Sequence, residues 1–347
     1  MTDQTAADHS DDQNVQIRLA SRPKGRPSAE NFTITAAPVP SPGDGQVLIR
    51  TQYLSLDPYM RGRMSDAPSY APPTEVGAVM VGGTVGEVVE SRAAGLSAGD
   101  VVLAYTGWQK YGVQRAGAVR KLDPAAAPVT TALGVLGMPG FTAYAGLTQI
   151  GKPRPGETVV VAAASGPVGA TTGQLAKIFG ARAIGVAGGQ EKVAYLKEIG
   201  FDAAIDHRSP DFKAQLAAAA PDGVDVYFEN VGAHVWDAVF PLLNDFARIP
   251  VCGLIGHYNA TELPAGPDQT PVLMSAILRK RLTLRGFIQT EFVAELMGEF
   301  LERATGWVRD GSLQYKEHVV DGLENAPEAF IGMLDGTNFG KLLIRVS

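Results

Sequence analysis

The sequence is poor in the residues that build disulfides and metal clusters. Its one cysteine, Cys252, excludes an internal disulfide and a zinc cluster made of cysteines. There are only five histidines, and none forms a close pair at the spacing of metal ligands. These histidines are His9, His207, His234, His257 and His318. We therefore expect no bound metal.

Long hydrophobic runs and an excess of positive charge are also absent. No apolar run reaches the roughly 20 residues that span a bilayer, and the net charge of −6 gives no basic field to attract nucleic acid or an anionic membrane. Residues 1–14 are polar and acidic without an apolar core, so we expect a disordered tail and not a signal or transit peptide. These absences predict a cytoplasmic protein with neither a nucleic-acid nor a membrane partner.

The pattern of the 347 residues changes along the chain, whose length suffices for two domains. Residues 16–124 contain short, closely spaced strand-like segments such as 47–53, 79–89 and 101–104, which is typical of a β-rich domain. From residue 140 to about 301, strand-like and helical segments alternate, which predicts a doubly wound parallel sheet. We predict an α/β fold in which a Rossmann domain, 138–308, is inserted into a discontinuous β-rich domain, 15–137 and 309–347.

The most informative motif is a glycine turn between a strand and a helix. Residues 158–162 read as a buried strand and residues 170–180 as a helix, joined by Ala163-Ala164-Ser165-Gly166-Pro167-Val168-Gly169. This layout places a pyrophosphate at a helix N-terminus, with Gly166 allowing close approach and Gly169 allowing close packing of helix and strand. Ala164 stands at the usual first glycine. A turn in an α/β sheet without any ligand is the alternative.

The residues after the next two strands indicate which dinucleotide would bind. Residues 186–190 read Val-Ala-Gly-Gly-Gln, without the acid that bonds the ribose 2′-hydroxyl in NAD-selective folds. Lys192 lies just beyond, and His207-Arg208 follow the third strand. A missing carboxylate with cations nearby fits a 2′-phosphate, so we predict NADP(H), although either cation alone could be a solvated surface charge.

Four sequence blocks, spread over nearly the whole chain, are specific as a set. They are Leu-Ser-Leu-Asp-Pro-Tyr-Met-Arg-Gly-Arg-Met at 54–64, Leu-Gly-Met-Pro-Gly-Phe-Thr-Ala-Tyr at 136–144, Tyr-Phe-Glu-Asn-Val-Gly at 227–232, and Asn-Phe-Gly-Lys at 338–341. With them the chain resembles the zinc-independent medium-chain dehydrogenase/reductases, in the subgroup of prostaglandin reductase, alkenal double-bond reductase and curcumin reductase. The resemblance implies that the β-rich domain is GroES-like and that the chain forms a homodimer.

The resemblance also implies positions for the cofactor. Gly166, Pro167, Val168 and Gly169 match the pyrophosphate turn, and Lys192 matches the lysine that binds the 2′-phosphate. His207 stands where the family commonly has a tyrosine, which leaves its role open, and Arg208 could share its work. The remaining implied contacts are Thr142, Asn230, Cys252, Gly253, Tyr258, Phe287, Ile288, Gln289 and Asn338.

The activity implied by the resemblance is NADPH-dependent reduction of a carbon–carbon double bond conjugated to a ketone or aldehyde. Hydride goes to the β-carbon and a proton to the α-carbon, so the site needs a donor near the developing oxyanion and a proton source. Tyr258 is the favoured candidate and Tyr59 a second one, whereas the cofactor ribose or solvent could do the same task. The expected partner is a small enone or enal; quinone reduction and non-catalytic NADPH binding are the alternatives.

Overall fold

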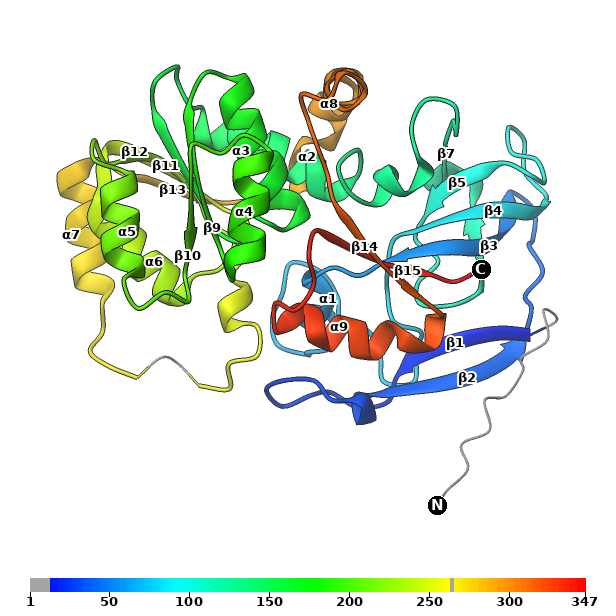
Figure 1. Ribbon diagram of the computed structural model, residues 1–347. Helices are drawn as coiled ribbons and strands as arrows, with labels where there is room; N and C mark the ends of the chain where they lie inside the picture. Colours follow the sequence, from blue (N-terminus) through cyan, green and yellow to red (C-terminus); the bar gives the residue numbers. More distant parts are fainter. Residues whose placement is uncertain (1–12, 263–264) are drawn as a thin grey trace. The chain divides into compact units, whose positions relative to one another are not determined.

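The structure, a computed structural model, describes residues 13–262 and 265–347 (Figure 1). The described residues belong to two compact units. One runs up to Thr130 and also contains Val319–Asp335 and Leu342–Ser347, and the other contains Thr131–His318 and Gly336–Lys341. No helix within these described ranges is long and apolar enough to cross a bilayer.

The second unit is built around a six-stranded sheet in the order β10-β9-β8-β11-β12-β13. Its neighbouring strands pair in parallel throughout. The strands are β8 (Thr158–Val161), β9 (Arg182–Ala187), β10 (Ala203–Asp206), β11 (Val224–Phe228), β12 (Leu243–Val251) and β13 (Thr283–Gly286). The chain reverses its direction of travel between β8 and β11, and such a switch point opens a crevice at the carboxyl ends of the strands.

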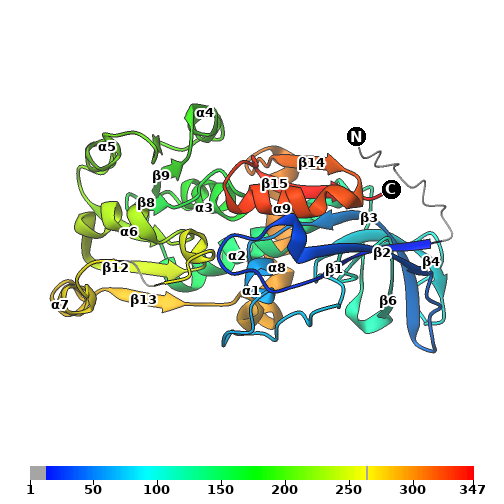
Figure 2. The ribbon, with the colours of Figure 1, turned by 90° about the horizontal axis from the view of Figure 1, so that it is seen from below.

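Helices cover both faces of this sheet, as Figures 1 and 2 show. The helices on one face share a single apolar core with the strands. They are α5 (Phe212–Ala219), α6 (Ala233–Val239) and α7 (Thr270–Lys280). The other face carries α3 (Pro167–Ile178) and α4 (Gln190–Glu198). Helix α2 (Met138–Ala145) packs beside α3, and α8 (Val293–Asp310) packs against α2. Burial on both faces explains why 159–161 is an unbroken run of valines with no exposed surface.

The first unit is rich in antiparallel strands. A sheet runs in the order β14-β15-β3-β4-β5-β7, with β6 also paired to β3, and β1 and β2 form a separate ribbon. The strands are β1 (Gln13–Leu19), β2 (Phe32–Pro38), β3 (Gln46–Ser55), β4 (Thr84–Ser91), β5 (Val101–Ala104), β6 (Tyr111–Arg115), β7 (Arg120–Lys121), β14 (Glu317–Asp321) and β15 (Lys341–Arg345). Two helices, α1 (Tyr59–Arg63) and α9 (Ala326–Leu334), complete it. The predicted fold class, a Rossmann domain inserted into a β-rich domain, is confirmed.

The limits of the units differ from the predicted ones at three places. The second unit begins at Thr131 and reaches His318, and it regains Gly336–Lys341 after the chain has left it. Long-range contacts explain this, because the Gln174 side chain on α3 bonds both the N–H (2.7 Å) and the carbonyl (2.9 Å) of Gln314. The ring of Phe339 likewise packs on Tyr195 of α4, with centroids 5.1 Å apart.

Two further expectations about the first unit need correction. Residues 1–12 of the predicted tail lie outside the described residues, but residues 13 and 14 already belong to β1, because they pair with Pro38 and Ala37 of β2. The predicted strand at 79–89 begins only at Thr84. Before it, Val79 makes a single isolated bridge to Arg18.

Candidate nucleotide-binding site

The predicted cofactor residues of the Rossmann sheet follow directly on the ends of its strands. Residues 163–169 follow β8, and residues 188–192 and 207–208 follow β9 and β10. Asn230 comes two residues after β11, residues 252–258 follow β12, and residues 287–289 follow β13. Because all these strands are parallel, their carboxyl ends share one edge of the sheet, where α/β folds bind their ligands.

The glycine turn after β8 needs its two glycines for different reasons. A Cβ on Gly169 would lie 2.4 Å from the Ala163 carbonyl oxygen and 2.7 Å from the Ala164 Cα, so only glycine lets α3 pack this closely. A Cβ on Gly166 would meet only the Ala163 oxygen, at 3.4 Å. The protein thus leaves room beside Gly166, and no side chain in the described part of the chain caps the first turn of α3. Both features suit a pyrophosphate bound at this helix N-terminus.

The alanine at the usual first glycine is accommodated by the neighbouring strand. Ala164 is fully buried, and the strained, left-handed residue of the turn is Ala163, with φ 48°. Gly185 on β9 faces the Ala164 methyl group, because a Cβ on Gly185 would lie 3.0 Å from it. The space that the motif gains from a glycine in the turn after β8 is therefore supplied by a glycine on β9, which the motif alone does not reveal.

A carboxylate shapes the turn after β9, although it comes from the next strand. Asp206, the last residue of β10, accepts the backbone N–H of Gly189 at 3.0 Å and that of Arg208 at 2.9 Å. Burial acts to raise its pKa, but these two N–H groups and the nearby positive charges hold the pKa below its usual range. Asp206 therefore stays charged and fixes the turn, a role that sequence reasoning missed.

Basic side chains lie around the turn whose backbone Asp206 holds. A Cβ on Gly188 would lie 2.8 Å from His207 Nε2 and 2.9 Å from Arg208 Nε, so both side chains lie against the turn. The Lys192 ammonium group donates to the Gly336 carbonyl at 2.7 Å. Burial and the charge of Arg208 lower the pKa of Lys192, which marks the two cations as neighbours. An anion between them would relieve their repulsion.

At the other half of the sheet, a buried carboxylate organises the strand ends. Glu229 is 2% exposed, and its Oε1 accepts the N–H groups of Val231 (2.7 Å) and Gly232 (2.8 Å). Its backbone carbonyl accepts those of Cys252 (2.9 Å) and Gly253 (3.2 Å). Burial raises the pKa of Glu229, and the donated N–H groups oppose that shift only in part. Sequence reasoning also missed this residue.

Asn230, Cys252 and Tyr258 lie on this scaffold. The Asn230 side chain donates to the Ala162 carbonyl at 2.8 Å and so ties the end of β11 to the glycine turn. Burial raises the pKa of the Cys252 thiol to about 12, but the residue as a whole is only partly buried, so its interpretation as a small buried hydrophobe holds in part. The Leu254 N–H donates to the Tyr258 hydroxyl oxygen at 3.4 Å, and a Cβ on Gly253 would lie 3.2 Å from that oxygen.

The segment after β13 adds one buried polar atom. Phe287 is buried against Phe228, with ring centroids 6.2 Å apart, and Ile288 donates its N–H to Glu291 at 2.7 Å. The carbonyl oxygen of the Gln289 side chain is buried, with no hydrogen-bond donor among the described residues. Such an atom is costly unless a ligand or water satisfies it.

Three predicted residues are placed less tellingly. Thr142 lies in α2 and donates its hydroxyl to the Met138 carbonyl, one turn back, at 2.7 Å. Asn338 donates to the Gly340 carbonyl at 3.0 Å and so shapes the turn that enters β15. Tyr59 begins α1 in the first unit, where burial and the charge of Asp57 raise its pKa well above the usual range. Its predicted catalytic role stays a prediction.

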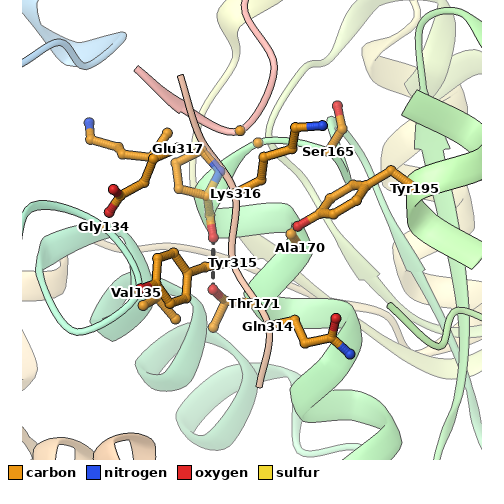
Figure 3. A pocket seen from close by; sticks show the side chains of 14 residues that line it. Gly134, Val135, Ser165, Ala170, Thr171, Tyr195, Gln314, Tyr315, Lys316 and Glu317 are labelled. Carbon is orange, nitrogen blue, oxygen red and sulfur yellow. Dashed lines mark hydrogen bonds between the residues drawn. The ribbon is translucent and has the colours of Figure 1, made fainter. Parts of the chain in front are cut away.

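A pocket opens beside the glycine turn, within the second unit (Figure 3). It is lined by the glycine turn and the start of α3, by Tyr195 of α4, and by residues 134–135, 314–317 and 340–341. The Lys316 ammonium group lies 3.7 Å from the Phe339 ring centroid, so an aromatic side chain holds this cation near the turn. Within 13–262 and 265–347, no three His, Cys, Asp or Glu side chains form a group that could hold a metal ion.

Comparisons with known proteins bear on both halves of the chain. One family model, described as the N-terminal domain of oxidoreductase, matches residues 15–122, and a second, described as zinc-binding dehydrogenase, matches residues 167–304. NADPH-dependent curcumin reductase of Escherichia coli (strain K12) is 56% identical over 95% of this chain and 96% of its own length. Prostaglandin reductase 1 of Rattus norvegicus is 38% identical, with 93% and 96% covered. The crystal structure of CurA from Vibrio vulnificus in complex with NADPH is 53% identical, with a TM-score of 0.93 and 96% and 99% covered.

Proposed function

The chain belongs to the medium-chain dehydrogenase/reductase family, in the subgroup of curcumin reductase and prostaglandin reductase, and we propose that it reduces the carbon–carbon double bond of α,β-unsaturated ketones and aldehydes. It is an NADP(H)-dependent oxidoreductase. The observation that carries the proposal is the row of strand ends at one sheet edge, with a phosphate-binding turn at β8 and the buried Glu229 scaffold at β11 and β12.

The residues at this edge fit NADPH. The space beside Gly166 suits the pyrophosphate, and Lys192, Arg208 and His207 around Gly188 suit the 2′-phosphate. The buried, unsatisfied Gln289 oxygen at the end of β13 suits an amide donor on the ligand. When bound, NADPH supplies the hydride that is added to the β-carbon of the substrate.

The chain's own contribution to the reaction is a hydrogen-bond donor and a source of protons. We assign this part to Tyr258, whose hydroxyl can accept the Leu254 N–H and at the same time donate to a substrate oxygen that gains negative charge. The hydroxyl would stabilise the developing enolate by donating a hydrogen bond to its oxygen. The proton that completes the α-carbon then comes from the hydroxyl or from water.

The activity is tested by following NADPH absorbance with an enone, a quinone and a secondary alcohol. We expect turnover of the enone only. Turnover of the quinone without the enone would favour quinone reduction, and NADPH binding without any turnover would favour a non-catalytic role. Tyr258→Phe should lower kcat about 100-fold, the lower range for a positioned acid, and should change the Kd for NADPH much less, because the phenyl ring is kept. An unchanged kcat would move the donor role to the ribose or to solvent.

The homodimer and the metal-free reaction belong to the same proposal. β13 lies at one end of the six-stranded sheet, and helix α7 beside it exposes Val272 (53%), Met274 (58%) and Leu278 (81%). Apolar side chains this exposed suit contact with a second copy. Sedimentation should give twice the chain mass, and Leu278→Glu should shift it toward the monomer.

Activity should survive dialysis against a chelator. A cytoplasmic location stays a prediction.

A further inference from the structure

Two histidines meet beside the turn that we assign to the 2′-phosphate. His207 follows β10, and His234 lies in the first turn of α6. His207 Nδ1 and His234 Nε2 are 3.1 Å apart, a hydrogen-bond distance, and the two rings are tilted with centroids 5.0 Å apart. The other ring nitrogen of His207, Nε2, lies against Gly188, 2.8 Å from where a Cβ would stand. His207 thus faces the turn, and His234 contacts the opposite side of the His207 ring.

We propose that His234 is a positioning residue for the cofactor, which orients His207 and makes its Nε2 a hydrogen-bond donor toward the 2′-phosphate. This inference rests on the proposed use of NADPH. It concerns a residue that neither the glycine motif nor the cation pattern includes. His234 acts through His207 and has no contact with the reacting atoms.

The protons of the pair decide whether His207 can serve a phosphate. If His234 Nε2–H donates to His207 Nδ1, the proton of neutral His207 sits on Nε2 and faces the turn. If His207 Nδ1–H donates to His234 instead, Nε2 of a neutral His207 carries a lone pair toward the turn, and this lone pair repels a phosphate oxygen. A bound phosphate therefore selects the first arrangement, in which His234 is the donor.

The charges around the pair keep this choice relevant near neutral pH. Burial, His234 and Arg208 lower the pKa of His207, and the carboxylate of Asp206 opposes them only in part. His207 is therefore neutral in the absence of a ligand, so the hydrogen bond from His234, and not a second proton, has to set its orientation.

The backbone that carries His234 is held firmly in place. Gly232 and Ala233, just before it, both have positive φ angles, 73° and 49°. The Ala233 N–H donates to His257 Nε2 at 3.1 Å, and Glu229 accepts the Gly232 N–H. A loop fixed at both residues can deliver the His234 ring to one position, as a positioning role requires.

The test compares two nucleotides that differ in the 2′-phosphate. Calorimetry would give the Kd of adenosine 2′,5′-bisphosphate and of adenosine 5′-monophosphate for the wild type, His234→Phe and His234→Gln. Phenylalanine keeps a ring against His207 but cannot donate, whereas glutamine keeps an N–H donor. We expect His234→Phe to weaken the bisphosphate about tenfold, the loss of one hydrogen bond to a charged group, and to leave the monophosphate unchanged. His234→Gln should keep the Kd of the bisphosphate near that of the wild type. In a His207→Phe background, adding His234→Phe should not change this Kd further.

Two results would overturn the proposal in different ways. Equal weakening of both nucleotides by His234→Phe, or no weakening of either, would reduce the histidine pair to a packing contact. A wild type that binds the bisphosphate no more tightly than the monophosphate would overturn the NADPH preference and this proposal together. Because His234 is exposed, its variants should melt within a few degrees of the wild type, and melting curves check this.

Discussion

The two halves of the Rossmann sheet hold their strand ends by different means. After β8 the chain relies on backbone, with the left-handed Ala163 and a Gly169 that no side chain could replace. After β11 and β12 it relies on Glu229, whose carboxylate and carbonyl together accept four backbone N–H groups. One half thus depends on the missing side chain of a glycine, which allows close packing. The other half depends on a buried carboxylate, whose charge is costly to bury.

The two acidic side chains that end strands sharpen this comparison. Asp206 closes β10 and Glu229 follows β11, and each accepts two N–H groups of the following or neighbouring loop through its carboxylate. Yet the pKa of Asp206 lies below its usual range and that of Glu229 above, because only at Asp206 do the N–H groups and nearby positive charges together outweigh burial. Similar contacts therefore stabilise the charged form of Asp206, whereas the charged form of Glu229 stays energetically costly.

The largest effect is expected from a side chain at Gly169. In Gly169→Val, the new atoms would meet the backbone of Ala163 and Ala164, which cannot rotate away. We expect the unfolding free energy to fall by about 3 kcal/mol, at the upper end for overpacking, and NADPH binding to be lost. Urea unfolding and fluorescence titration measure the two effects.

Gly166→Ala is the matched control for that variant. Its Cβ would be 3.4 Å from the nearest atom, so stability should stay within about 0.5 kcal/mol of the wild type. NADPH should nevertheless bind more weakly, because the methyl group occupies the space beside the turn. If the two variants lose stability alike, the separate roles given to the two glycines are wrong.

Lys192→Ala should weaken the binding of NADPH by about 2 kcal/mol, within the range of a charge-assisted contact, and should leave the binding of NADH almost unchanged. The physical reason is that its ammonium group lies beside Arg208 at the turn, where an added phosphate compensates both charges. The ratio of kcat/KM for the two cofactors measures this. Lys197→Ala, on the same helix, is the control and should change neither. Equal losses for both cofactors would mean that Lys192 does not meet the 2′-phosphate.

Much of the fold could be predicted because it depends on local patterns. The valines of β8, the glycine turn and the alternation of strands and helices are all visible within short windows. The limits of the units could not be predicted, because they depend on pairs such as Gln174 with Gln314, 140 residues apart. The same holds for Gly185, whose only sign is a glycine inside a strand.

The candidate site divides along the same line. Residues 166–169, Lys192 and Arg208 could be predicted as site residues because glycine spacing and missing acids are sequence signals, and their binding roles stay predictions. Asp206, Glu229 and His234 were missed as site residues, because their roles arise from contacts with loops that other strands position. An acid at or just after the end of a buried strand was the available signal for the first two. Nothing in the sequence brings His234 to His207.

The smallest expected effect concerns Glu229 and depends on pH. Since its pKa is raised from 4.5 in the folded state, the folded protein binds this proton more tightly than the unfolded chain. The cost of the buried charge is absent below pH 4.5 and grows as pH rises through the folded pKa.

Glu229→Gln keeps an oxygen for the N–H groups of Val231 and Gly232 but carries no charge. Its stability relative to the wild type should therefore increase as the pH rises from 4.5 through the folded pKa of Glu229 and then level off, with a total gain of less than about 2 kcal/mol. Urea unfolding across that range measures the difference, in which other titrating groups cancel. A difference that stays constant or shrinks as pH rises would mean that the charge at Glu229 is not strained, and that the two halves of the sheet are supported alike.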